Sequence, residues 1–151
     1  MTKLVINGSN LYIAGNFRYV GSYVRPFLVS VNASTGAVNT GFNAGPDFAV
    51  KDMLISSGTL YFGGDFTSIN NSYTGSAGAA INTTTALADV NFPLVNGTIY
   101  TVISDGSGGW YIGGSFTRVG TFERNNLAQI DGSGNLTNFN PNINGTVNAL
   151  I

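Results

Sequence analysis

The stretch that decides the fold is Trp110-Tyr111-Ile112-Gly113-Gly114-Ser115-Phe116-Thr117-Arg118-Val119-Gly120, because the chain contains this pattern three times. The other copies are Leu60–Ile69 and Leu11–Val20. Each copy places a Tyr between two apolar residues, follows it with a small residue and Gly, and continues with one polar residue and Phe. The three tyrosines lie 49 and 50 residues apart, and such a period across a whole chain is typical of a repeat protein.

Each repeat is expected to contain four short strands and no helix. No stretch shows the apolar spacing of a helix, and turn-forming residues recur about every 8–12 residues, as in all-β proteins. The first strand precedes a turn, the second is the Tyr-containing stretch, and the fourth is short and polar. The ranges expected for the first strands are Lys3–Ile6, Lys51–Ile55, Ile99–Ile103 and Val147–Ile151, those for the third are Pro26–Val31, Gly78–Ile81 and Asn126–Ile130, and those for the fourth are Val38–Phe42, Leu87–Phe92 and Leu136–Phe139.

The chain is therefore expected to form one repeat domain, 1–151, with approximate repeats 1–49, 50–97 and 98–145. Residues 146–151 repeat the phase of Met1–Ile6 and are expected to start a fourth repeat. In this alignment Ile6, Ile55, Ile103 and Ile151 mark the ends of the first strands.

The third copy carries a resemblance to a known family. Its segments Tyr111–Gly120, Arg124–Asp131 and Phe139–Pro141 resemble a delta-sixty-type repeat, a member of the kelch-like β-propellers. The first copy departs from the family pattern at Ala14, where the family has Gly, and the second copy lacks the repeated arginine. The resemblance implies blades of four strands, and it implies no single activity.

Four-stranded units of this length indicate β-propeller blades. Propellers close with about 4–8 blades, whereas three repeats are present. We therefore expect an incomplete ring unless the chain is oligomeric, for example as a two-fold dimer of six blades, or part of a longer chain. The expected partners are thus other copies of itself or further repeats. A β-trefoil, which also has three four-stranded units, is the alternative fold.

The repeat positions themselves are interpreted as structural. A Gly inside a strand marks a bulge or a close approach of another backbone, and the aromatic residues beside it fill the space between blades. The repeated arginine is interpreted as a tie between the connection of the second and third strands and nearby carbonyl groups. These positions are Tyr12, Gly15, Phe17, Arg25, Tyr61, Gly63, Gly64, Phe66, Tyr111, Gly113, Gly114, Phe116 and Arg124.

Composition excludes several classes of function. Charged residues make up 9% of the chain, against about 25% in an ordinary soluble domain, and this is typical of secreted, cell-surface or virion proteins. The net charge is −1 and the six basic residues are scattered, so no nucleic-acid partner is expected. No apolar run approaches the ~20 residues of a membrane span. Met1–Ile6 is interrupted by Asn7–Asn10, so it is interpreted as a strand and turn and not as a signal peptide.

The residues for catalysis or metal binding are sparse. Without His or Cys, the chain has no imidazole base, no Ser-His-Asp triad and no thiolate ligand. Asp47 and Asp52 are interpreted as loop carboxylates and not as a glycosidase pair. The segments Asp105–Gly108 and Asp131–Gly134 are interpreted as turns and not as calcium loops. No enzyme activity, metal or cofactor is expected.

The leading hypothesis is a non-catalytic binding or scaffold module that contacts a glycan or a surface protein. The alternatives are a structural assembly subunit of a fibre or virion, and a propeller-type polysaccharide-active enzyme. Ligands of propellers bind at loop faces, where amides hydrogen-bond and aromatic rings stack. The candidate ligand-binding residues are Tyr19, Tyr23, Asn43, Phe48, Asn96, Tyr100 and Asn142.

Overall fold

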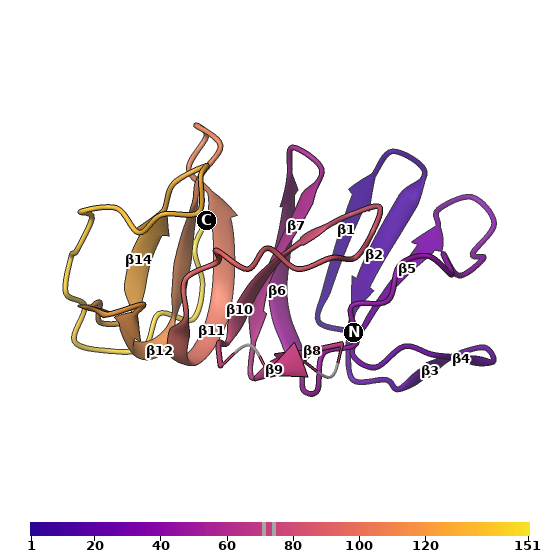
Figure 1. The fold of residues 1–151 in the computed structure, drawn as a ribbon, viewed down its shortest axis with the longest axis horizontal. Helices are drawn as coiled ribbons and strands as arrows, with labels where there is room; N and C mark the ends of the chain where they lie inside the picture. Colours follow the sequence, from indigo (N-terminus) through magenta and orange to yellow (C-terminus); the bar gives the residue numbers. More distant parts are fainter. Residues whose placement is uncertain (71, 74) are drawn as a thin grey trace.

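The protein is all-β in the part that the computed structural model describes, residues 1–70, 72–73 and 75–151. Three antiparallel sheets stand side by side in a row (Figure 1). In each sheet the Tyr-containing strand lies in the middle. The first sheet holds β1 (Lys3–Asn7), β2 (Asn10–Ala14) and β5 (Leu28–Asn32), the second holds β6 (Val50–Ser56), β7 (Thr59–Gly64) and β10 (Gly78–Asn82), and the third holds β11 (Val95–Ser104), β12 (Trp110–Val119) and β14 (Leu127–Ile130).

The three sheets repeat one register. Lys3, Asp52 and Thr101 lie opposite the first small residue of the motif, which is Ala14, Gly63 and Gly113 respectively. The second and third sheets share a register shift beside this position, at Lys51 and at Tyr100. Such a bulge bends the strand and increases its local twist.

The expected alignment of Ile103 with Ile6 and Ile55 is off by one residue. Ile6 and Ile55 lie opposite Leu11 and Leu60, whereas Ile103 lies opposite Tyr111. Ser104 takes the position of the two isoleucines. Because side chains alternate between the two faces of a strand, Ile103 points to the opposite face from Ile6 and Ile55.

The expected fourth strands are shorter than predicted. Each is reduced to a single bridge, at Val31–Val38, Ile81–Ala88 and Ile130–Leu136. The turns before them contain Asn32, Asn82 and Asp131, whose side-chain oxygens accept hydrogen bonds from backbone N–H groups two to four residues later. These local bonds satisfy the backbone without a sheet partner, so the pairing with the third strand does not extend.

Short hairpins, which the sequence analysis did not predict, connect the second and third strands. They are β3 (Tyr19–Val20) with β4 (Tyr23–Val24), β8 (Ser68–Ile69) with β9 (Ser72–Tyr73), and the end of β12 with β13 (Phe122–Glu123). Gly21 and Gly120 occupy equivalent turn positions with φ of 58° and 60°, which glycine adopts without strain.

The predicted strand Val147–Ile151 is wrong, because these residues form an extended segment outside any named strand. The Val147 N–H donates to the Gly114 carbonyl at 3.0 Å, and the Leu150 N–H donates to the Thr101 hydroxyl at 3.2 Å. The segment therefore lies against the third sheet on the side away from the second.

Two hydrophobic clusters fill the spaces between the sheets. In the first, Tyr12 and Leu28 of the first sheet pack with Met53 and Phe62 of the second. In the second, Tyr61 and Ala80 of the second sheet pack with Trp110, Ile112 and Val102 of the third. The second sheet is thus covered on both faces. Among the described strands, none pairs back to close the row into a ring.

Candidate functional site

The motif glycines permit close contact between neighbouring sheets. A Cβ on Gly63 would collide with the Ile99 side chain of β11, and a Cβ on Gly113 would lie 2.7 Å from the Val147 side chain. On Gly64 and Gly114 a Cβ would meet the carbonyl oxygens of residues 49 and 98. On Gly15 a Cβ would lie 3.1 Å from Met1. The absence of a side chain at these positions therefore permits the close approach of the neighbouring strand or sheet.

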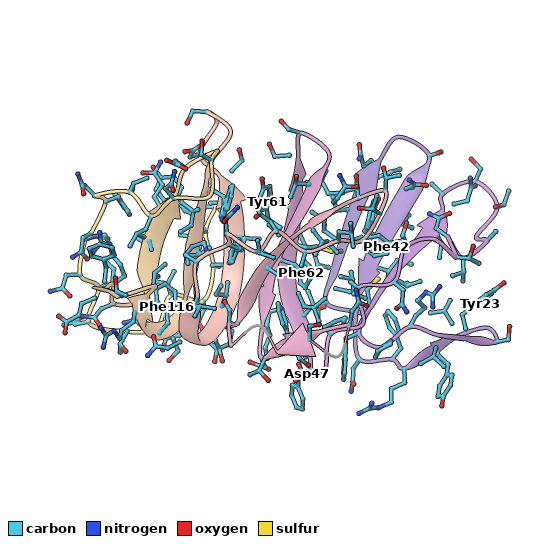
Figure 2. The ribbon with its side chains drawn as sticks, viewed as in Figure 1. Tyr23, Phe42, Asp47, Tyr61, Phe62 and Phe116 are labelled. Carbon is cyan, nitrogen blue, oxygen red and sulfur yellow. The ribbon has the colours of Figure 1, made fainter. Side chains whose placement is uncertain are left out.

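Two of the three motif tyrosines, Tyr12 and Tyr61, contact the following unit, whereas Tyr111 contacts a residue of its own unit. Tyr12 is fully buried and its hydroxyl donates to the Thr83 carbonyl at 3.1 Å, a contact from the first unit to the second. Tyr61 (labelled in Figure 2) packs on Trp110 with ring centroids 3.8 Å apart, and burial raises the pKa of the Tyr61 hydroxyl. Tyr111 packs edge-on against Phe139. Phe66 and Phe116 are buried, whereas Phe17 of the first unit is half-buried.

A carboxylate connects all three sheets. Asp52 is 8% exposed and lies 2.7 Å from the Lys3 ammonium of the first sheet. It accepts hydrogen bonds at 2.9 Å from its neighbour Met53 N–H and from the Val102 N–H of the third sheet. Thr101 holds the equivalent position one unit later and accepts the Leu150 N–H in the same way. A side-chain oxygen at this position thus receives an N–H group of the following unit.

The two repeated arginines make identical contacts. Arg25 donates to the carbonyls of Val24 and Thr40 at 2.8 and 3.2 Å, and Arg124 donates to those of Glu123 and Thr137 at 2.8 and 2.9 Å. In both, the Nε is buried without a hydrogen-bond partner. This geometry is the tie between the strand connection and nearby carbonyl groups that a structural role requires.

The candidate stacking residues are not brought together. Tyr19 and Tyr23 are 67% and 42% exposed on the β3–β4 hairpin (Figure 2 labels Tyr23), but they lie opposite Val24 and Val20 and so point to opposite faces. Phe48 stacks on Phe27 with centroids 6.0 Å apart. Tyr100 lies 5.6 Å below the Lys51 ammonium.

The candidate amides are separated as well. The Asn96 oxygen accepts from the Thr117 and Arg118 N–H groups, and its amide donates to the Thr117 hydroxyl. The Asn142 oxygen accepts from the Asn125 amide at 2.7 Å. Asn43 is exposed. Asn96 therefore serves the fold by fixing the start of β11 to the end of β12.

Asp47 makes the same contacts one unit earlier. Its carboxylate accepts from the N–H groups of Thr67 and Ser68 and from the Thr67 hydroxyl (Figure 2 labels Asp47). Partial burial opposes ionisation, but these hydrogen bonds outweigh it and lower the pKa of Asp47. Asp47 in the second unit and Asn96 in the third thus make an equivalent connection. Each joins the chain near the start of its unit's first strand to the residues just before or within the hairpin that follows the motif.

Asp105 and Asp131 cap their turns. The Asp105 carboxylate accepts the Ser107 and Gly109 N–H groups and the Gln129 amide, and the Asp131 carboxylate accepts bonds within its own loop. Hydrogen bonds from the backbone lower the pKa of both carboxyls. In residues 1–70, 72–73 and 75–151, no group of three or more acidic residues is placed to hold a metal ion.

An exposed aromatic residue that the sequence analysis missed is Phe122, which is 60% exposed on β13. It corresponds to Tyr23, since both pair with the residue before the turn glycine and both lie two residues before the repeated arginine. The Arg25 and Arg124 guanidinium carbons lie 5.7 and 6.0 Å from the Tyr23 and Phe122 ring centres. An aromatic residue two positions before the repeated arginine is the sequence pattern that could have identified Phe122.

A cavity of about 390 Å³ lies beside the second sheet, lined mainly by apolar groups that include Ile69, Ala79, Phe92 and Leu94. No protein-family model, curated protein or solved structure among those compared with the chain matches it. Within the described residues, no helix has the length and apolar character needed to cross a membrane.

Proposed function

We propose that the chain is a non-catalytic binding and scaffold module made of β-propeller-type blades. Three features support the blade interpretation: the strand order within each sheet, the face-to-face packing of successive sheets, and the repetition of the glycine contacts at each joint. A trefoil is supported less well, because its units do not stack as separate sheets in a row.

The observation that carries the binding role is the repeated pair of an exposed aromatic ring and a buried or half-buried arginine. Tyr23 with Arg25 and Phe122 with Arg124 occupy equivalent hairpins of the first and third units. The guanidinium is fixed by two carbonyl groups and in turn fixes the ring by a cation–π contact. An exposed ring that is already ordered loses little entropy on binding, and such rings dominate recognition surfaces.

The partner class that suits these rings is a glycan or a surface protein. Aromatic rings provide a large apolar face, and the surrounding chain is rich in polar, uncharged residues. The low charge is typical of a secreted, cell-surface or virion setting, and this is the setting we propose. The function is proposed to be non-catalytic because Asp47 and Asp52 are both engaged in hydrogen bonds of the fold.

A glycan array tests this role directly. We expect the folded chain to bind one class of glycan, and Tyr23→Ala or Phe122→Ala to reduce that signal about tenfold or more, the cost of a lost aromatic contact of about 1.4 kcal/mol. Leu87→Ala is the matched control, since Leu87 is 71% exposed and lies outside the hairpins. If the folded chain bound neither a glycan nor a protein through these rings, the binding proposal would be wrong and only a structural role would remain.

A second function, a structural assembly subunit, is favoured by a separate observation. Leu4 and Ile6 on β1 are 44% and 66% exposed, although the equivalent residues of the second sheet pack against a neighbour. An exposed apolar sheet face is typical of an interaction surface.

A further inference from the structure

The three sheets share one apolar face, defined here as the leading face, and two of these faces are covered by the preceding sheet. In the second sheet, Met53, Phe62 and Ala79 lie opposite one another across the strands, and this row is part of the cluster against the first sheet. In the third sheet, the row of Val102, Ile112 and Ala128 packs on the second sheet. The same register in the first sheet selects Leu4, Ile13 and Val29, followed by Ile6, Leu11 and Val31.

The leading face of the first sheet is open along β1. Leu4 is 44% exposed, whereas its equivalents Met53 and Val102 are 1% and 6% exposed. Val29 and Val31 on β5 are buried, so the exposed part lies over β1 and β2. None of these six side chains belongs to either described hydrophobic cluster.

The other end of the row has the matching surface. On the third sheet, the face away from the second presents Thr101, Gly113 and Tyr111, at the positions that Asp52, Gly63 and Tyr61 use to hold the third sheet on the second. Residues 146–151 lie on this face, with Val147 at Gly113 and Leu150 at Thr101. They occupy the place that the first strand of a following unit takes at the internal joints.

We propose that the leading face of the first sheet binds the third sheet of a second copy of this chain, with β1 displacing residues 146–151. The contact continues the interface already formed twice inside the chain, so its geometry is a copy of the joint between the second and third sheets. Thr101 accepts the Leu4 N–H there, as Asp52 accepts the Val102 N–H. Thr101 is neutral, so it places no charge against the incoming strand. Two copies joined at both ends form a closed ring of six sheets, within the range of propellers.

This proposal rests on the assembly role and not on the hairpin rings, and the two are separable by experiment. Light scattering after size exclusion is expected to give a concentration-dependent particle of twice the 15.7 kDa chain mass. The double change Leu4→Asp and Ile6→Asp is expected to abolish the dimer without altering glycan binding. Leu87→Asp, at an exposed residue elsewhere, is expected to leave the dimer unchanged. Removal of residues 146–151 is expected to strengthen dimerisation, because it vacates the receiving face.

The orientation of the copies is tested with single cysteines, which are clean probes because the chain has none. Tyr61 and Trp110 touch at the internal joint, and the equivalent pair between copies is Tyr111 and Leu11. A short thiol cross-linker is expected to join Tyr111→Cys to Leu11→Cys in a mixture and to join neither variant to itself. Self-linking of Leu11→Cys, growth into filaments, a chain that stays monomeric with and without residues 146–151, or a dimer unaffected by the aspartates would overturn the proposal.

Discussion

Gly63 sets the spacing between the second and third sheets, since the Ile99 side chain fills the space where a Cβ would stand. The contact is possible only because the motif places a residue without a side chain in the middle strand of a sheet. Glycine there weakens the strand intrinsically. The closer packing of Ile99, which is fully buried, offsets this weakness.

Gly63→Ala is expected to lower the free energy of unfolding by about 1–3 kcal/mol, the usual cost of overpacking. Gly41→Ala is the control, because Gly41 has open space around its Cα and no positive φ. Gly113→Ala is expected to cost less than Gly63→Ala, because Val147 belongs to an extended segment that can shift. Urea denaturation measures all three. An effect of Gly63→Ala no larger than that of Gly41→Ala would contradict the close-contact role.

Asp47 can be tested by changing it to Asn, the residue that stands at the equivalent position of the next unit, Asn96. Asn96 bonds the equivalent three groups in the next unit, with its amide donating to the Thr117 hydroxyl where the Asp47 carboxylate accepts from the Thr67 hydroxyl, so Asp47→Asn is expected to change stability at neutral pH by less than about 0.5 kcal/mol. The folded-state pKa of Asp47 is lowered, so its contribution is complete above the unfolded pKa and is lost as pH falls through the folded value. Below about pH 4, the wild type is therefore expected to lose stability more steeply than the variant. Parallel urea midpoints across this range would refute the idea.

At the scale of elements, the joint between sheets depends on a polar contact as well as on the apolar clusters. Asp52 is nearly buried and joins Lys3 to the Val102 N–H, whereas Asp65 pairs with Lys51 and Thr98 in a more exposed place. Asp52 lies in β6 and Asp65 directly follows β7, and each carboxylate accepts a hydrogen bond from β11 of the neighbouring sheet, so the two can be compared.

Asp52→Ala is expected to destabilise the protein by about 1–3 kcal/mol, because it leaves the Val102 N–H without its acceptor in a buried place. Asp65→Ala is expected to cost at most about 1 kcal/mol, as exposed ion pairs do. Thermal unfolding followed by circular dichroism compares them. Equal decreases in stability for the two variants would show that burial does not make the Asp52 contacts more stabilising than those of Asp65.

The sequence predicted the elements that local pattern controls. The middle strands, the positions of Gly63 and Tyr12 at contacts between units, and the all-β class follow from periodicity and from the turn residues. The fourth strands were overestimated, because Asn32 and its equivalents satisfy the backbone inside the turn. The hairpin at Gly21 contains a turn-forming glycine, but its strands have only two residues each. Such strands are too short to show an alternation of apolar and polar residues in the sequence.

The candidate binding residues were harder to place from sequence. Whether Asn96 faces solvent or caps Thr117 depends on a partner 21 residues away, which no local pattern encodes. Phe48 was a candidate for stacking on a ligand, and its ring stacks on Phe27, which lies on another connection. Tyr19 and Tyr23 face apart because the hairpin register sets their directions.

At the scale of the whole molecule, the row of sheets makes stability uneven. The second sheet has a neighbour on each face, while the first has an open leading face. In such stacks each unit is stabilised mainly by its neighbours. Opening is therefore expected to begin at the ends of the row.

Hydrogen exchange is expected to show this gradient. The amides of β7 should exchange most slowly and those of β1 faster, with residues 146–151 fastest of all, since local opening follows the number of packed neighbours. Mass spectrometry of peptic fragments at several times resolves the three sheets. Uniform exchange across the sheets would indicate that the row unfolds as one cooperative unit.

The position shared by Lys3, Asp52 and Thr101 carries a cation, an anion and a neutral hydroxyl in turn. Units with such similar motifs could stack in the wrong order while the chain folds, which is a characteristic failure of repeat proteins. A second copy of the middle unit beside itself would set one aspartate against another. We infer that the three different side chains at this position help each unit to recognise its correct neighbour, so that the units stack in the order in which they follow one another along the chain.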